Sequence, residues 1–140
     1  MTIETFLPMN PPTCTHQEKR VSVVRGKPHF YDPPKVAAAR QKITALLVKA
    51  APESPMTGPL RLVVRWCFPR GKGHKDGEYR ATKPDTDNLQ KLLKDCLTAA
   101  RWWKDDAQVA SELAEKFWAE VPGIYVRVEE AVGSCLVTDD

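Results

Sequence analysis

Apolar residues recur at helical spacing in two segments of the chain. In the first segment, residues 35–50, the apolar positions are Val36, Ala39, Ile43, Leu46, Leu47 and Ala50. In the second segment they are Leu89, Leu92, Leu93, Cys96, Leu97 and Ala100. Steps of three and four residues place such side chains on one face of a helix. Pro84 can precede the second helix but not stand inside it, so Asp85 or Asp87 is expected at its N-cap.

Alternation of apolar and polar residues predicts β-strands elsewhere. The predicted strands are residues 2–7, 20–24, 29–31, 60–68, 108–121 and 123–129. A turn centred on Gly26 joins the second and third as a hairpin, and a turn at Pro122-Gly123 is expected to pair the last two. The strand over 60–68 is apolar at Val63 and Cys67 as well, so we expect both of its faces to be covered. Together these elements predict an α+β fold, a small mixed or antiparallel sheet packed by two α-helices.

A length of 140 residues favours one domain spanning residues 1–140, with residues 132–140 as a flexible tail. No apolar run approaches the length of a membrane span, and the N-terminal segment is too short and too acidic for a secretory signal. We therefore expect a cytoplasmic protein with no membrane partner. The four cysteines include no C-x-x-C pair, which disfavours a zinc site, and we expect all of them to be reduced.

Positive charge is concentrated locally, although the formal net charge is only +3. The polar, glycine-containing loop over residues 70–82 is expected to be mobile without a ligand. In and beside this loop the candidate DNA-binding residues are Arg70, Lys72, Lys75, Arg80 and Lys83. In the hairpin they are Arg20, Arg25 and Lys27. Such cations can neutralise the phosphates of DNA. The alternative interpretations are an ordinary solvated loop for residues 70–82 and a plain structural edge for the hairpin.

Acidic residues bracket the second predicted helix. Asp85 and Asp87 stand at its start, and Asp105 and Asp106 follow its end. Lys91 and Asp95 continue the stripe of Asp87 along the helix at intervals of four residues. Carboxylate oxygens are the ligands that Mg²⁺ prefers, and a bound metal can activate water against a phosphodiester. The pattern thus suggests a metal-dependent phosphodiesterase, which requires Asp106 to come close to Asp85 and Asp87.

Each of these features also has a simpler interpretation. A lone aspartate before a helix is more often a cap, and Asp87 with Lys91 is an ordinary ion pair at i,i+4. Asp105-Asp106 alone is more often a turn. The metal hypothesis depends on the joint occurrence of these features beside a basic loop. Trp102, Trp103 and Trp118 are expected in the core, and the three histidines match no ligand spacing.

Two sequence motifs carry a resemblance to a known family. Residues 83–91 read Lys-Pro-Asp-Thr-Asp-Asn-Leu-Gln-Lys, and residues 103–109 read Trp-Lys-Asp-Asp-Ala-Gln-Val. Together they resemble the RusA family of Holliday junction resolvases, which is common in phages and prophages. The resemblance implies a small homodimer that needs Mg²⁺, for which Mn²⁺ can substitute, and that cuts two strands of a four-way DNA junction.

The resemblance also implies roles for individual residues. It implies that Asp85, Asp87 and Asp106 bind the metal and that Lys91 acts in catalysis. Asp105 is then a turn residue or a supporting partner of the ligands, and Asp95 is another candidate for such a supporting position. Two other functions stay open: a metal-dependent phosphodiesterase acting on flaps, linear DNA or RNA, and a catalytically inactive DNA-binding module.

Overall fold

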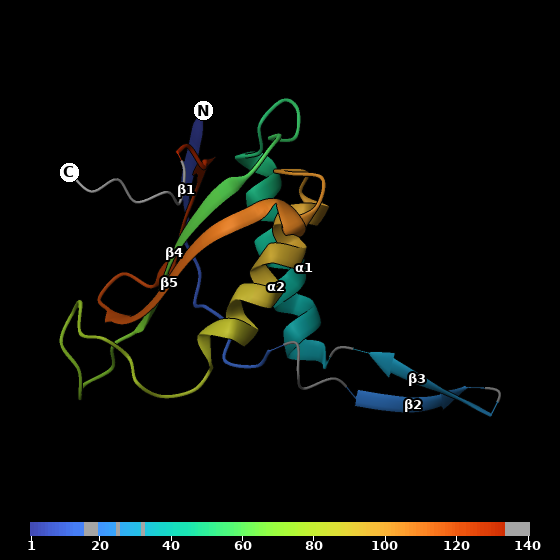
Figure 1. The fold of residues 1–140 in the computed structure, drawn as a ribbon. Helices are drawn as coiled ribbons and strands as arrows, with labels where there is room; N and C mark the ends of the chain where they lie inside the picture. The colour runs from blue at the N-terminus through green and yellow to red at the C-terminus, as the bar shows by residue number, and fades with distance from the viewer. Residues whose placement is uncertain (16–19, 25, 32, 134–140) are drawn as a thin grey trace, which may run out of the picture.

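A four-stranded sheet with two helices on one of its faces forms the body of the protein (Figure 1). The computed structural model describes residues 1–15, 20–24, 26–31 and 33–133. The elements are β1 (Thr2–Leu7), β2 (Arg20–Val24), β3 (Lys27–Tyr31), α1 (Pro34–Lys49), β4 (Leu60–Pro69), α2 (Thr86–Ala99), the 3₁₀ helix η2 (Asp106–Gln108), β5 (Val109–Ala119) and β6 (Gly123–Glu130). The predicted α+β class is confirmed. Of the tail predicted over residues 132–140, the part from residue 134 onward lies outside the described residues.

The order of the strands is β1-β6-β4-β5. β4 and β5 are parallel, and the other two pairs are antiparallel. The prediction that β5 and β6 form a hairpin is therefore wrong, because β4 lies between them. A parallel pair needs a crossover connection, and α2 supplies it between β4 and β5. The strand predicted over 108–121 was correct in type, but its partner is fixed by this crossover rather than by the nearest turn.

A β-bulge decides which side chains of β5 face the helices. Leu60 pairs with Val109 but Arg61 pairs with Ser111, so Ala110 is an extra residue in β5. Such an insertion reverses the inward and outward alternation beyond it. As a result Leu113 is 49% exposed. The inner face of β5 instead carries the partners of Leu62, Val64, Trp66 and Phe68, which are Glu112, Ala114, Lys116 and Trp118.

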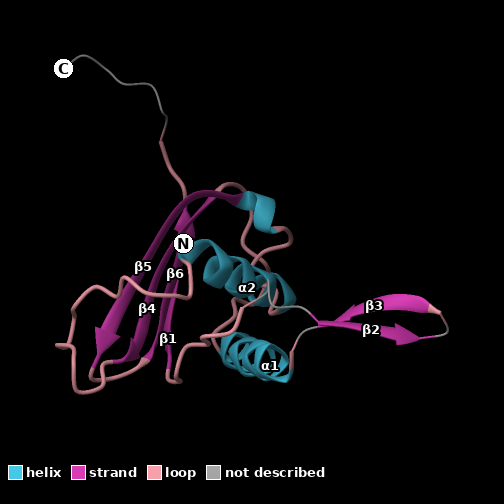
Figure 2. Cartoon of the chain, turned by 90° about the horizontal axis from the view of Figure 1, so that it is seen from below, coloured by secondary structure: helices cyan, strands magenta, loops and turns pink. Residues whose placement is uncertain are grey.

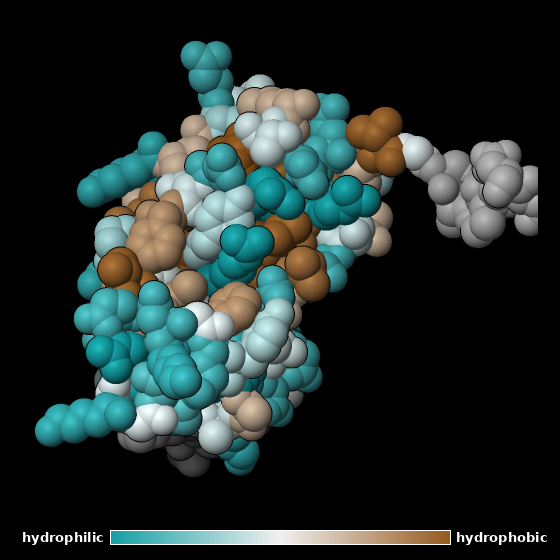
Figure 3. All heavy atoms as spheres, turned by 90° about the vertical axis from the view of Figure 1, so that its left-hand side faces the viewer, coloured by the Kyte–Doolittle hydropathy of each residue, from teal (hydrophilic) through white to brown (hydrophobic). Residues whose placement is uncertain are grey.

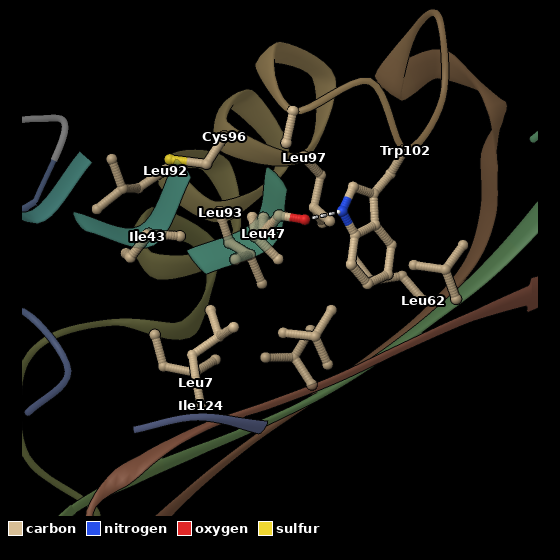
Figure 4. Close-up of a cluster of buried hydrophobic side chains, with 14 of the residues drawn as sticks. Leu7, Ile43, Leu47, Leu62, Leu92, Leu93, Cys96, Leu97, Trp102 and Ile124 are labelled. Carbon is tan, nitrogen blue, oxygen red and sulfur yellow. Dashed lines mark hydrogen bonds between the residues drawn. The ribbon is translucent and has the colours of Figure 1, made fainter. Parts of the chain in front are cut away.

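The core lies between the sheet and the helices (Figure 2). All six apolar positions predicted for the second helix are buried. Trp102 and Trp103 are buried as predicted, and the Trp102 indole donates to the Leu47 carbonyl at 2.9 Å (Figure 4). This bond joins the turn after α2 to the end of α1. Among the described residues, α1 and α2 therefore form one layer, and their packing keeps α2 against the sheet.

The opposite face of the sheet has no helix over it, so the expectation that both faces of β4 are covered is only partly met. Val63 is 4% exposed, yet its neighbours Arg61 and Arg65 are exposed. Their guanidinium groups lie near Glu129 and Glu115 of the adjoining strands. Figure 3 views the molecule from this side and shows hydrophilic and hydrophobic side chains interspersed. Surface ion pairs thus shield a strand that the sequence suggests is fully enclosed.

The predicted hairpin is present and projects from the body beside the start of α1 (Figure 1). Gly26 has φ +76° at its turn, a conformation that glycine adopts without steric cost. β3 begins at Lys27, two residues before the predicted start. Lys27 is exposed, whereas the side chain of Arg20 and the whole of Arg25 lie outside what the structure describes.

The loop over residues 70–82 is anchored, contrary to the predicted mobility. The Gly77 amide donates to the Trp118 carbonyl at 2.8 Å, and the Trp118 amide donates to the Glu78 carbonyl at 2.8 Å. The Asp76 carboxylate accepts from the Glu120 amide at 2.9 Å. The loop therefore runs along the second half of β5 as an additional, short antiparallel partner. This contact fixes the approach of the chain to α2.

Two smaller expectations from the sequence also have an outcome. Cys67 and Cys96 are free thiols, and Cys135 lies outside the described residues. Burial raises the pKa of Cys96 and of Cys67, as expected for thiols in apolar surroundings. None of the helices in the described part of the chain has the length and apolarity that a bilayer crossing requires.

Candidate active site at the start of α2

Two exposed carboxylates stand at the N-terminus of α2. Asp85 occupies the N-cap position with extended backbone angles, but its side chain makes no capping hydrogen bond. Asp87 lies in the first turn, and its Oδ1 accepts from the Asn88 amide at 3.0 Å. The simple interpretation of Asp85 as a side-chain cap is therefore wrong. Both carboxylates remain open to solvent, at a helix end whose dipole attracts anions.

Lys91 lies one turn beyond Asp87 and is exposed. In the part of the chain that the structure describes, no ion pair joins Lys91 to Asp87, although residues four apart on a helix can reach each other. The ammonium group is thus available to an anion from solution. Asp95, two turns beyond Asp87, instead pairs with Arg40 of α1 at 3.6 Å. That contact ties α2 to α1 and places Asp95 away from the two carboxylates.

Asp106 does not join Asp85 and Asp87 within one chain. It begins η2, which follows the opposite end of α2 (Figure 1). α2 has 14 residues, so its ends lie about 20 Å apart at 1.5 Å per residue. β5 leads to the same conclusion. Val109 starts the strand directly after η2, whereas Lys116, seven residues and about 23 Å further on, is the residue that contacts the Pro84 carbonyl.

Asp105 has a structural role in the same turn. Its Oδ1 accepts from the Ala107 amide at 2.8 Å, and the Gln108 side chain accepts from the Asp105 amide at 3.1 Å. These two bonds form a capping box around η2. The Gln108 amide group also donates to the Met56 carbonyl at 3.0 Å. Asp105 therefore shapes the turn, while no hydrogen bond of the Asp106 side chain is found within the described ranges.

The candidate DNA-binding cations divide into engaged and open groups. Arg70 pairs with Glu120 and donates to the carbonyls of Gly71 and His74, so it holds the loop together. Arg80 is also engaged and only partly exposed. The open side chains are Lys72, Lys75 and Lys83, all exposed. Lys72 and Lys75 line one side of a surface hollow of about 580 Å³.

The donors present suit an open magnesium site rather than a closed cage. Within the described residues, no group of three His, Cys, Asp or Glu side chains can hold a metal in one chain. Mg²⁺ is commonly bound by only one or two protein carboxylates, with water and substrate phosphates completing its shell. Asp85 and Asp87 meet that requirement, because both are exposed and neighbour each other at one helix start.

Similarity to known proteins identifies the family. The family described as Endodeoxyribonuclease RusA matches residues 8–129, which include both motifs and every candidate ligand. The chain belongs to the RusA family of endodeoxyribonucleases. It is an enzyme of the class that hydrolyses phosphodiester bonds in DNA.

Two relatives of this RusA-family chain cover most of its length. The Crossover junction endodeoxyribonuclease rusA of Lactococcus phage r1t is 30% identical over 118 residues, covering 83% of this chain and 88% of that protein. The protein named Uncharacterized protein YqaN of Bacillus subtilis (strain 168) is 31% identical over 122 residues, covering 79% of this chain and 85% of that protein.

The RusA motif contains a residue that the sequence did not single out. Gln90 is 4% exposed; it accepts from the Trp66 indole at 2.6 Å and donates to Glu112 at 2.7 Å. The other oxygen of Glu112 accepts from Lys94 at 3.0 Å. This chain of bonds attaches the carboxylate-bearing helix to the sheet through a buried amide. A polar residue within the apolar face of α2 was the signal that could have revealed it.

Lys116 is the second residue beside the candidate site that the sequence did not suggest. Its Nζ donates to the Thr82 and Pro84 carbonyls, each at 2.7 Å. Burial lowers the pKa of Lys116, Arg80 lowers it further, and Asp85 opposes them by raising it. A lysine on the inner face of a strand is unusual. Lys116 faces inward because the bulge at Ala110 reverses the alternation of β5.

Proposed function

We propose that this chain is a Mg²⁺-dependent, structure-selective endodeoxyribonuclease that resolves Holliday junctions in cytoplasmic DNA recombination and repair. The observation that carries the proposal is the pair of exposed carboxylates, Asp85 and Asp87, presented uncapped at the start of α2 in a RusA-family chain. The phage relative is named for crossover junction cleavage, which supports a four-way junction as the substrate.

The residues of the chain divide the chemistry between them. Asp85 and Asp87 would hold Mg²⁺ or Mn²⁺, which when bound polarises the phosphoryl oxygen and supplies an activated water. Lys91 projects from the same helix one turn beyond Asp87 and carries a charge that no described residue neutralises within the ion-pair distance. It would stabilise negative charge that develops on the phosphate. Gln90 keeps the helix seated on the sheet, so the two carboxylates hold their direction.

A symmetric homodimer accounts for the separation of Asp106 from the other carboxylates. β5 is an edge strand, and the loop pairs only with its second half, at Lys116 and Trp118. Among the described residues, the edge from Val109 to Glu115 has no backbone partner. Exposed edges of this kind readily pair with another chain. Leu113, 49% exposed on this strand, adds an apolar contact.

Antiparallel pairing of two such edges would bring the distant carboxylate to the site. With the free stretches paired along their length, the partner subunit's Val109 lies opposite Glu115. The partner subunit's Asp106, three residues earlier, then lies beyond Glu115, toward Lys116 and the Pro84 carbonyl that leads into Asp85. A two-fold dimer would contain two such sites, as required for cutting two opposed strands of a junction.

The exposed lysines of the loop are proposed to contact phosphates. Changing Lys72 and Lys75 together to Ala should weaken junction binding and reduce the salt dependence of the binding constant. Each lost phosphate contact lowers the slope of log K against log[salt] by about 0.9. Binding measured at several salt concentrations checks this, with Lys42→Ala on the exposed side of α1 as the matched control. An unchanged slope would remove the loop from the DNA interface.

A cleavage assay tests the proposed function. Purified protein is incubated with a four-way junction or with a linear duplex of the same sequence, with Mg²⁺ or with EDTA. Symmetric cuts in the junction only, and only with Mg²⁺, are expected. Equal cleavage of duplex, flap or RNA substrates would indicate a different phosphodiesterase. Junction binding without cleavage at any Mg²⁺ concentration would indicate an inactive DNA-binding module.

A further inference from the structure

The three residues before Asp85 are held by two cations. The Lys116 ammonium donates to the carbonyls of Thr82 and Pro84, and the Arg80 guanidinium donates to the carbonyl of Lys83. Arg80 Nε also donates to the Thr82 hydroxyl at 3.1 Å. Three successive carbonyl groups are thus bonded by charged donors, an arrangement we call the two-cation clamp.

Both cations of the clamp are anchored to the sheet, although Arg80 belongs to the loop. The Arg80 guanidinium lies 4.3 Å from the centre of the Phe68 ring and 4.4 Å from that of Trp118. Its position between two aromatic rings of β4 and β5 restricts its movement. The Arg80 amide donates to the Lys116 carbonyl at 3.0 Å. Lys116 therefore stands on β5, and Arg80 is anchored against β4 and β5, at the end of the sheet where α2 begins.

The segment held by the clamp is the one that aims Asp85. Asp85 directly follows Pro84, and its side chain makes no capping bond of its own within the helix. Its direction is consequently set by the backbone that precedes it. Lys116 also lies close enough to Asp85 for their charges to interact. A cation near Asp85 offsets part of the repulsion between Asp85 and Asp87.

We propose that Arg80 and Lys116 are positioning residues that preorganise Asp85 and Asp87 for a divalent cation, an inference that rests on the function proposed above. Arg80 accordingly acts behind the carboxylates and not as a phosphate contact. If the clamp served only to close the loop, its loss would lower stability alone. If it orients the ligands, its loss weakens metal binding in protein that is still folded. Supporting residues of metal ligands typically change metal affinity by about 10–100-fold.

Calorimetric titration of the full-length protein with Mn²⁺, without DNA, tests the inference. Lys116→Met is expected to weaken Mn²⁺ binding at least about tenfold. Lys116→Arg, which keeps the charge and the donors, should recover most of the affinity. Lys42→Met is the matched control, because Lys42 is exposed and lies on α1, a different helix from the one that carries the two carboxylates. It should bind Mn²⁺ within twofold of the wild type. Thermal unfolding of each variant establishes the temperature at which all are folded.

The possible outcomes separate this inference from the proposed function. If the wild type binds Mn²⁺ and Lys116→Met binds it equally well, the clamp has no positioning role. Equal weakening in Lys116→Met and Lys42→Met would also overturn the inference, because the loss would then be general. Wild-type protein that binds no Mn²⁺ would instead remove the metal site itself. Should Lys116→Met fail to fold, Arg80→Lys, which loses the ring contacts but keeps the charge, is measured in its place and should weaken binding in the same direction.

Discussion

Asp87→Asn is expected to reduce junction cleavage by at least about 10²–10³-fold, the loss typical of removing one group that stabilises a transition state. The substitution keeps the shape of the side chain and removes the charge that the metal requires. Junction binding should be unchanged or tighter, because one negative charge near the DNA is lost. Single-turnover cleavage and a binding titration of the same protein measure the two effects separately.

Asp95→Asn is the matched control for this substitution. It makes the same chemical change on the same helix, two turns away, where the carboxylate pairs with Arg40 of α1. Its cleavage rate should stay within about threefold of the wild type, since surface ion pairs contribute little. Wild-type cleavage by Asp87→Asn, or equal losses in the two variants, would show that the start of α2 is not the active site.

Asp106→Asn is expected to cause a loss of cleavage as large as that of Asp87→Asn, although the two residues lie about 20 Å apart along α2. The reason is the proposed dimer, in which the partner subunit's Asp106 approaches Asp85 across the β5 edge. Cleavage rates of the two variants under identical Mg²⁺ concentrations check the prediction.

Asp105 supplies the control for Asp106. Asp105→Asn alters the adjacent carboxylate, which accepts from the Ala107 amide as part of the capping box around η2. An amide oxygen can still accept that bond, so cleavage should be nearly unchanged and thermal stability should fall slightly. A strong loss in Asp105→Asn together with normal cleavage in Asp106→Asn would reverse the assignment of the two residues.

Local patterns predicted the elements well. The spacing of Leu89, Leu93 and Leu97 was sufficient to define α2, and alternation defined β1 and β4, because these signals depend on neighbouring residues alone. The candidate carboxylates at the start of α2 also followed from local order, since Pro84 fixes where a helix can begin.

Long-range features could not be read in the same way. The pairing of β5 with β4, and the bulge that turns Lys116 inward, depend on contacts between residues about 50 positions apart. The anchoring of the loop depends on backbone bonds to Trp118, which leave no pattern in the loop sequence. The expectation that Asp106 meets Asp85 within one chain failed for a related reason. α2 carries the chain away from Asp85 and β5 brings it back, so Asp106, which lies between them, stays at the far end.

Mixed dimers of Asp87→Asn and Asp106→Asn protein test the central claim most directly. Each variant alone should be inactive, because both sites of its dimer lack one ligand. In a mixed dimer one site combines both defects, while the other combines the intact Asp87 of one subunit with the intact Asp106 of its partner. Co-expression with two different affinity tags isolates such dimers, and the account predicts that they nick one strand of a four-way junction in the presence of Mg²⁺. Mixed dimers as inactive as the two parents would contradict it.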